Sequence, residues 1–283
     1  MAELDLEFRG KLALITGATT GPKNLQYLAN PPSKHRRRLR ACSLAQWRQL
    51  ALTCASGEEK MFALEEELRA LRLRPDQLPA LLAAQIEPLV ISMHEVDLAQ
   101  ADSIEHLFTG IAKSHGKLGP DILVSNAGYG KLTSDVADID VAEFDHTISV
   151  NLRAAFILSK LSIPHMAARR WGRIVYVSSL AAHGASINGC HYAASKAGLH
   201  GLMKSLAAKH ARDGITVNDV APGMIGETGM IPDASHTVGT AGNVRNIPVG
   251  RLGRPDEVAK VVVMFCSTGY MTDQSVVLAG ELK

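Results

Sequence analysis

Residues 173–206 constrain the fold of this chain more than any other stretch. Residues 173–177 read RIVYV, a run of β-branched and apolar side chains typical of a buried strand. The strand ends at Ser178 and Ser179, and from Leu199 to Leu206 apolar side chains recur at helical spacing, which predicts a helix with one buried face. Open α/β sheets bind ligands at the carboxyl ends of their strands, so Ser179 stands where a ligand is expected.

The helix predicted after this strand carries a phenol and an amine. Tyr192 and Lys196 are four residues apart, so they share a helix face one turn apart. A free phenol titrates near ~10, and lowering its pKa by about 3 units needs roughly 4 kcal/mol of differential interaction, which a desolvated amine can supply. We predict that Tyr192 donates a proton, that Lys196 lowers its pKa, and that Ser179 converges on the same carbonyl. The alternative is a solvated helix face.

Composition and charge exclude several classes of function. With 46% hydrophobic residues and a net charge of +2, the 283-residue chain is predicted to be globular, without general affinity for nucleic acid. No apolar run reaches the ~18 residues of a membrane span, and residues 1–10 resemble neither a secretory signal nor a transit peptide. The four cysteines are scattered, which argues against a zinc site or a disulfide framework. We expect no metal, no membrane partner and a cytoplasmic location.

One segment departs from the even distribution of charge. Residues 34–40 read KHRRRLR and follow Ser33, which could cap a helix. The run is either the solvated face of such a helix or a patch that binds phosphate or nucleic acid. We favour the solvated face and expect no nucleic-acid partner.

A glycine-rich turn follows the first predicted strand. Residues 11–16 (KLALIT) lead directly into Gly17 and Gly21. Glycines at such a turn let the backbone approach a pyrophosphate, and the helix behind it offers free N–H groups to the anion. The turn therefore predicts a dinucleotide site.

Ser179, thirteen residues before a Tyr192-x-x-x-Lys196 motif, resembles the active site of the short-chain dehydrogenase/reductase family. The resemblance implies that Tyr192 is the proton donor, that Lys196 lowers its pKa and holds the cofactor ribose, and that Ser179 hydrogen-bonds the substrate carbonyl. It also implies that Asn151 is a fourth catalytic residue, which passes protons through water. From the residues alone, Asn151 could equally be a surface residue of a helix.

The same resemblance assigns a set of cofactor-binding residues. Thr16-Gly17-x-x-x-Gly21 is similar to the family's T-G-x-x-x-G-x-G loop, but Lys23 holds the third glycine position, where it either contacts a phosphate or is solvated. Asp97 either hydrogen-bonds the adenine or caps a helix over residues 103–111. The implied cofactor contacts are Thr16, Gly17, Gly21, Asp97, the Asn126-Ala127-Gly128 turn, Tyr192, Lys196, the Pro222-Gly223-x-Ile225 turn and Thr228.

The resemblance implies an α/β fold, a single-domain doubly wound parallel sheet of Rossmann type spanning residues 1–283. Its first crossover is enlarged and irregular, because residues 22–48 exceed what one βαβ unit needs; they are a genuine insertion or an irregular coding model. Polar, glycine-rich residues 226–246 suit a lid over the substrate. The second predicted strand ends at Ala55 with no acid before Glu58, which favours NADP(H) over NAD(H).

The function implied is an oxidoreductase that transfers a hydride between NADP(H) and a carbonyl or secondary alcohol. The motifs are most similar to those of 3-oxoacyl-(acyl-carrier-protein) reductases and related ketoreductases, so a ketone or acyl thioester is the expected substrate. Enoyl reductases use a wider Tyr-to-Lys gap, which disfavours double-bond reduction. As in relatives, we expect a homodimer or homotetramer packed through the helices of Asn151 and Tyr192. Because the phosphate loop is altered, the alternative is a cofactor-binding sensor or an impaired reductase.

Overall fold

The computed structural model describes residues 8, 10–17, 49–55, 90–133, 135–184 and 186–282. The strands are β1 (Leu12–Ile15), β2 (Gln49–Cys54), β3 (Val90–Glu95), β4 (Ile122–Ser125), β5 (Gly172–Val177), β6 (Ile215–Pro222) and β7 (Ser275–Leu278). The helices are α5 (Ala101–His115), α6 (Val141–Ile148), α7 (Ala154–Ala168), α8 (Gly189–His210) and α9 (Pro255–Ser267). Short helical turns are η4 (Val136–Asp138), η5 (Ser149–Arg153), η6 (Leu180–Ala182), η7 (Ala211–Asp213), η8 (Ala234–Thr237) and η9 (Val244–Asn246).

These strands form one parallel sheet in the order β3-β2-β1-β4-β5-β6-β7. The chain builds outward from β1 to β3, returns to the other side of β1 at β4, and continues to β7. The predicted doubly wound parallel sheet of Rossmann type is confirmed. Its strand order reverses between β1 and β4, and ligands of such sheets bind outside the carboxyl ends of the strands at this point.

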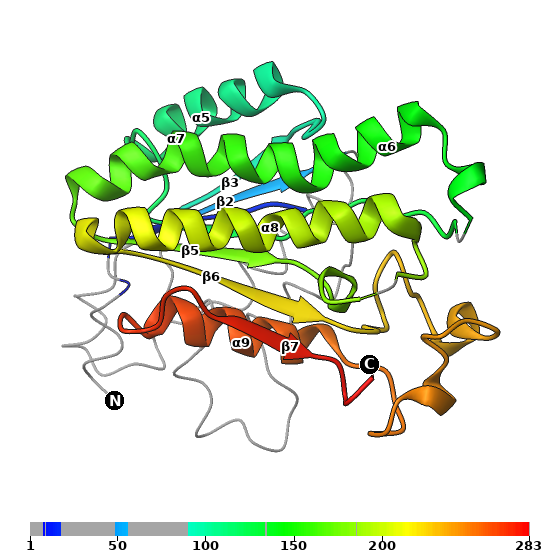
Figure 1. Cartoon of the computed structure of the whole chain (residues 1–283). Helices are drawn as coiled ribbons and strands as arrows, with labels where there is room; N and C mark the ends of the chain where they lie inside the picture. Colours follow the sequence, from blue (N-terminus) through cyan, green and yellow to red (C-terminus); the bar gives the residue numbers. More distant parts are fainter. Residues whose placement is uncertain are drawn as a thin grey trace, which may run out of the picture.

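Helices cover both faces of the sheet, as Figure 1 shows, with α5, α7 and α8 on one side and α9 on the other. Alternate residues of β1 explain why both faces are covered. Leu12 and Leu14 belong to the core beneath α5, α7 and α8, whereas Ala13 and Ile15 belong to the core beneath α9. A strand that is apolar on both sides must be buried on both sides, which is the usual condition of a parallel strand.

The helical stretch over residues 141–168 is interrupted. α6 ends at Ile148, η5 is one π-helical turn, and α7 continues to Ala168. Phe144 is 42% exposed and Phe156 is 50% exposed, while Ala155 is buried. The extra residue of the π-helical turn changes which side chains face the sheet.

A buried carboxylate ties the amino ends of the strands to two helices. Asp121, which precedes β4 and is fully buried, accepts hydrogen bonds from the Leu12 N–H at 2.9 Å and from Lys117 Nζ at 2.7 Å. Arg169 Nε lies 3.1 Å and His165 Nε2 lies 3.4 Å from its other oxygen. Burial raises the pKa of Asp121, but the hydrogen bonds from Lys117 and Leu12 outweigh burial, so its pKa is below the usual value.

We expect Asp121→Ala to lower the free energy of unfolding by about 3 kcal/mol, because the substitution leaves buried or half-buried cations without their carboxylate. Urea unfolding measures this loss. Asp213→Ala is the control, since Asp213 pairs with His210 at the surface and should cost below about 1 kcal/mol. The ionised Asp121 contributes to the free energy of unfolding above the usual carboxyl pKa, and this contribution is lost as pH falls through the lower pKa of the folded protein. Acid should therefore narrow the difference in unfolding free energy between wild type and Asp121→Ala. Equal losses in both variants would contradict this role.

Candidate active site

Asn151 lies in the π-helical turn and holds two other segments in place. Its side chain is buried; Oδ1 accepts a hydrogen bond from the Tyr129 N–H at 2.7 Å, and Nδ2 donates to the Tyr129 carbonyl at 2.9 Å. Nδ2 also lies 2.9 Å from the hydroxyl of Ser195 on α8. The alternative that Asn151 is a surface residue is therefore wrong. Its amide joins the loop after β4 to α8, and π-helical turns of this kind are frequent at functional sites.

Tyr192 and Ser179 meet at the carboxyl end of β5. Tyr192 lies in the first turn of α8 and is 7% exposed, and its phenol is hydrogen-bonded to the hydroxyl of Ser179. Ser179 caps η6, because its Oγ accepts a hydrogen bond from the Ala181 N–H at 3.2 Å. The cap fixes the position of the Ser179 side chain beside the phenol. This pairing was predicted from the sequence as convergence on one carbonyl.

Lys196 lies behind the phenol, one helical turn further along α8. It is 3% exposed, its Nζ donates to the Val177 carbonyl at 2.9 Å, and Nζ is 5.8 Å from the centre of the Tyr192 ring. Burial lowers the pKa of Lys196 to about 8, and the negative charge of Asp219 acts in the opposite direction. Lys196 therefore carries its charge at neutral pH but loses it in mild alkali.

The structure corrects the prediction that Lys196 lowers the pKa of Tyr192. Burial raises the pKa of Tyr192, and the hydrogen bond with Ser179 only partly offsets that rise. The reason is that both side chains are desolvated together, and the ammonium hydrogen-bonds the Val177 carbonyl rather than the phenol. The phenol is therefore held in its protonated form, ready to donate.

The turn after β4 packs directly on the end of β1. The N–H groups of Asn126 and Ala127 both donate to Thr16 Oγ1 at 3.1 Å, and Asn126 Nδ2 donates to the Thr16 carbonyl at 2.9 Å. Gly17 has a φ of +67°, and a Cβ at this position would lie 2.7 Å from the Ala127 Cα. Only glycine fits here, which explains the predicted turn.

Bare backbone at Gly128 leaves space beside the lysine. A Cβ on Gly128 would lie 3.2 Å from Lys196 Nζ and 3.7 Å from Asn151 Oδ1. A cradle of bare backbone thus lies where the strand order reverses. It is formed by the carboxyl ends of β1 and β4, the turn over residues 126–128 and Lys196. The residues present fit a dinucleotide whose ribose lies against this turn.

The other predicted cofactor residues are less closely gathered. Asp97 is exposed after β3, and its Oδ1 accepts from the Ala99 N–H at 2.9 Å; it is not the cap of α5, whose N-cap is Gln100. Pro222 ends β6, and a Cβ on Gly223 would lie 3.0 Å from Ala279. Gly21, and with it Lys23 and the run over residues 34–40, lies outside the described residues.

Thr228 uses its hydroxyl within its own turn. Its Oγ1 donates to the Ile225 carbonyl at 3.2 Å and accepts from the Ile231 N–H at 3.1 Å. Ile225 itself is buried and pairs with Gly253. The cofactor contact predicted for Thr228 would have to use the acceptor capacity that remains on this hydroxyl.

Sequence reasoning missed Ser195 and Tyr129. Ser195 is fully buried, and its hydroxyl donates to the Tyr192 carbonyl at 2.7 Å while lying 2.9 Å from Asn151 Nδ2. The Tyr129 backbone completes the pairing with Asn151. Ser195 could have been singled out as a small polar residue between Tyr192 and Lys196 on a helix, whereas Tyr129 contributes through its backbone and leaves no residue-type signal.

Comparisons with known proteins identify the family of this chain. Residues 73–280 match the family model described as Enoyl-(Acyl carrier protein) reductase, which is more than half of the chain. The chain belongs to the short-chain dehydrogenase/reductase family. It is 30% identical to the 3-oxoacyl-(acyl-carrier-protein) reductase of Aquifex aeolicus, over 99% of this chain and 100% of that protein. It is 40% identical to Nodulation protein G of Azospirillum brasilense, over 61% of this chain and 70% of that protein.

Solved structures of this family have the same fold. A short-chain type dehydrogenase/reductase from Mycobacterium marinum superposes with a TM-score of 0.76 at 24% identity, covering 100% of this chain and 99% of that one. Acetoin dehydrogenase from Salmonella typhimurium superposes with a TM-score of 0.72 at 26% identity, covering 96% and 95%. The chain is an oxidoreductase of this family, whose members use a nicotinamide cofactor.

The described residues contain neither a cluster of metal-ligating side chains nor a membrane-spanning helix. In that part of the chain, no three His, Cys, Asp or Glu side chains are grouped as metal ligands would be. Within the same residues, none of the helices combines the length and the apolar character that crossing a bilayer requires.

Proposed function

We propose that this protein is a cytoplasmic NADPH-dependent ketoreductase that reduces a 3-oxoacyl thioester or a related ketone, with the reverse oxidation of the alcohol as its other direction. The observation that carries the proposal is the hydrogen-bonded pair of Tyr192 and Ser179, with Lys196 behind it, beside a glycine cradle at the carboxyl ends of β1 and β4. Relatives named as 3-oxoacyl-(acyl-carrier-protein) reductase and as acetoacetyl-CoA reductase of Shinella zoogloeoides support this substrate class.

The proposed mechanism follows from where charge develops. A reduced nicotinamide, when bound, would supply the hydride that the carbonyl carbon receives, so negative charge would build on the carbonyl oxygen. Ser179 donates a hydrogen bond to that oxygen, and Tyr192 transfers its proton to it. Lys196 would hold the ribose of the cofactor through its ammonium, beside the phenol. Asn151 keeps the loop at Tyr129 and the helix at Ser195 in register, which orients Tyr192.

The choice of NADP(H) rests on the end of β2. Cys54 ends that strand, and Ala55 follows with no carboxylate to accept a hydrogen bond from a ribose 2′-hydroxyl. We expect NADPH to bind more tightly than NADH.

Residues 226–246 are proposed to cover the substrate. They carry η8 and η9 and extend beyond the sheet on the side where β6 ends (Figure 1). Gly226 N–H donates to the Gly253 carbonyl at 3.0 Å, which anchors the start of the segment, while Met230 is 44% exposed. An apolar side chain at this edge suits contact with an acyl chain.

Two measurements test the proposed function. Titration of NADPH fluorescence with the purified protein tests cofactor binding, and loss of NADPH absorbance with a panel of ketones and 3-oxoacyl thioesters tests turnover. We expect both. Binding without turnover across the panel would favour the alternative of a cofactor-binding sensor, and the absence of binding would overturn the proposal.

The pH dependence of ketone reduction is a further prediction. Tyr192 stays protonated at neutral pH because burial raises its pKa, whereas the Lys196 pKa of about 8 lies just above neutrality. The rate constant kcat/KM for reduction should therefore be flat near pH 7 and fall about tenfold per unit above the pKa of Lys196, because the ammonium is lost as pH rises. Measurement of kcat/KM as a function of pH, with the cofactor saturating, checks this alkaline decrease. A rate that rises through the same range would contradict the assignment of Lys196.

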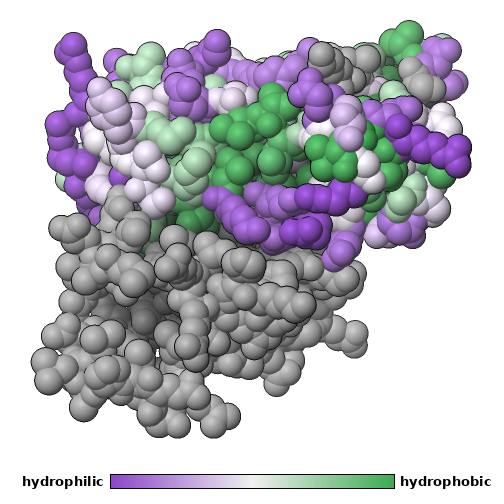
Figure 2. All heavy atoms as spheres, turned by 90° about the horizontal axis from the view of Figure 1, so that it is seen from below, coloured by the Kyte–Doolittle hydropathy of each residue, from purple (hydrophilic) through white to green (hydrophobic). Residues whose placement is uncertain are grey.

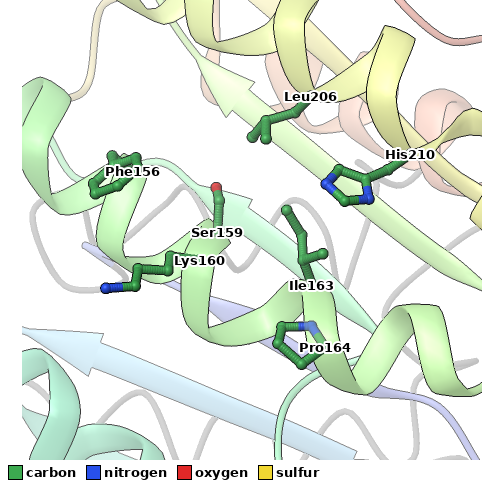
Figure 3. A pocket seen from close by; sticks show the side chains of 7 residues that line it. All are labelled: Phe156, Ser159, Lys160, Ile163, Pro164, Leu206 and His210. Atoms are coloured by element: carbon green, nitrogen blue, oxygen red, sulfur yellow. The ribbon is translucent and has the colours of Figure 1, made fainter.

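We also propose that the protein assembles as a homodimer or homotetramer through α7 and α8. Their outer surface carries the half-exposed Phe156 and a hollow of about 270 Å³, shown in Figure 3. The hollow is lined by Phe156, Ser159, Lys160, Ile163 and Pro164 of α7 and by Leu206 and His210 of α8. In a two-fold dimer, the same helices of a second copy would cover this face.

A second apolar face supports the tetramer. Figure 2, viewed from the side of α9 and β7, shows hydrophobic side chains gathered on this face with hydrophilic ones around them. Met264 of α9 is 37% exposed and Val277 of β7 is 47% exposed, and β7 is the edge strand of the sheet. Two different two-fold contacts generate a tetramer.

Light scattering after size-exclusion chromatography measures the assembly. Phe156→Lys should reduce the molar mass of the assembly to that of a dimer or a monomer, because the lysine charge would be buried in the contact through α7 and α8. Lys260→Glu changes an exposed charge on α9 that pairs with Asp256 and should leave the contact through α7 and α8 intact. A monomeric wild type would overturn the assembly without affecting the proposed reaction.

A further inference from the structure

A buried carboxylate lies on the strand next to the one whose end the lysine of the proposed active site contacts. Asp219 lies in the middle of β6 and is fully buried, and its charge acts on Lys196 in the direction that keeps the amine protonated. Of its two oxygens, Oδ2 lies 3.1 Å from His200 Nε2, and Oδ1 has no hydrogen-bond partner within the described part of the chain. An ionised carboxylate in such surroundings needs compensating positive charge.

His200 connects this carboxylate to the helix of Lys196. His200 follows Lys196 by four residues on α8, so the two side chains lie one turn apart on the face of α8 that contacts β5 and β6. Lys196 donates to the carbonyl of Val177 at the end of β5, and His200 contacts Asp219 on the neighbouring strand. The helix thus holds both side chains over two neighbouring strands.

His200 also contacts the loop that carries Ser179. Its Nε2 is 3.4 Å from the Ser178 hydroxyl, and its ring lies 4.6 Å from the ring of His183, centre to centre. The titratable groups facing Lys196 and Asp219 are therefore Tyr192 and His200 on α8 and His183 on the loop after η6. None of them brings a second carboxylate, so Asp219 supplies the negative charge of this cluster among the described residues.

We propose that Asp219 is a positioning residue for Lys196, a buried counter-charge that keeps the amine in its ammonium form, and that His200 holds Asp219 by hydrogen bonding. The inference rests on the proposed function for its catalytic consequence, whereas the charge state of Lys196 can be observed without turnover. The pKa of Lys196 is about 8 with Asp219 present, so a fall of about one unit without the carboxylate would leave the amine about half charged at pH 7. A reductase that needs the ammonium would then lose about half of its activity at pH 7 and recover it in mild acid.

Nuclear magnetic resonance of protein labelled with ¹³C-lysine tests this directly. The Cε resonance of Lys196, assigned by its absence in Lys196→Met, is followed as a function of pH. We expect a wild-type midpoint near 8, and we expect Asp219→Asn, which keeps the shape of the side chain, to move it down by about one pH unit, a tenfold change in proton affinity. An unchanged or higher midpoint in folded Asp219→Asn would overturn the proposal.

Two substitutions of His200 provide an independent test if Asp219→Asn does not fold. His200→Leu removes the hydrogen-bond partner that fixes the Asp219 side chain, so the carboxylate is no longer held in place and the midpoint of Lys196 should fall. His200→Gln keeps a donor and should restore the wild-type midpoint. Equal midpoints in wild type, His200→Leu and His200→Gln would show that His200 does not hold the counter-charge.

Asp213→Asn is the matched control, because Asp213 also pairs with a histidine of α8. Its Oδ2 lies 2.9 Å from Nδ1 of His210, the last residue of that helix, and the pair is partly exposed. This substitution should leave the Lys196 midpoint unchanged; a shift as large as that of Asp219→Asn would overturn the proposal. The alkaline limb of kcat/KM should move with the midpoint in Asp219→Asn. If wild type binds no cofactor and turns over no ketone, the proposed function fails, while the midpoints still decide the role of Asp219.

Discussion

Tyr192→Phe is expected to lower kcat for ketone reduction by about 10²–10⁴-fold, the range of a positioned general acid. The substitution removes one oxygen from a side chain that is 7% exposed, so the ring still fills its site and the cofactor cradle at Gly128 is unchanged. NADPH affinity should therefore stay within about twofold. Stopped-flow or steady-state loss of NADPH absorbance measures kcat, and fluorescence titration measures affinity.

Tyr270→Phe is the matched control, because Tyr270 is fully exposed at the end of α9 and should leave kcat unchanged. If Tyr192→Phe retained the wild-type kcat, the proton would come from another group and the proposed mechanism would be wrong. If it lost cofactor binding as well, the effect would be structural rather than catalytic.

Ser179→Ala should lower kcat by about 10²–10³-fold, the cost of removing one donor from a developing oxyanion. The Ser179 hydroxyl also bonds the Tyr192 phenol and accepts from the Ala181 N–H, so its loss frees the phenol to adopt other positions and raises the pKa of Tyr192 further. Ser179→Thr keeps the hydroxyl and should recover part of the rate.

A double-mutant cycle separates the two roles of Ser179. Because Ser179 and Tyr192 act on the same oxygen, Ser179→Ala combined with Tyr192→Phe should lose far less than the product of the single losses. Fully multiplicative losses would mean that the two groups act independently, contrary to their hydrogen bond.

Local patterns in the sequence predict the strands well. The run at residues 173–177 corresponds to β5 at Gly172–Val177, and residues 11–16 enclose β1 at Leu12–Ile15. Strands of a parallel sheet covered on both faces are continuous apolar runs, so a few neighbouring residues are enough to predict where they lie. The Gly17 turn is equally local, because its positive φ excludes other residues wherever the chain must make it.

The candidate site was only partly predictable. The spacing of Ser179, Tyr192 and Lys196 singled out three side chains that the structure brings together, since helix periodicity alone places two of them on one face. The depth of burial was not predictable, and it reverses the expected change in the pKa of Tyr192. The exposure of Phe156 and the burial of Asn151 likewise depend on the π-helical turn, and no local sequence pattern predicted that turn.

The sequence by itself determined the strand runs, the glycine turn and the identity of the proposed proton donor, because each depends on residues close together in the chain, and its resemblance to the family implied the parallel α/β fold. Only the tertiary structure decided the charge state of Lys196 and the presence of Asp219 beside it. Asp219 lies 23 residues after Lys196 and on a different element. Desolvation and long-range charge are set by everything that surrounds a group, and the chain brings those surroundings together only when it folds.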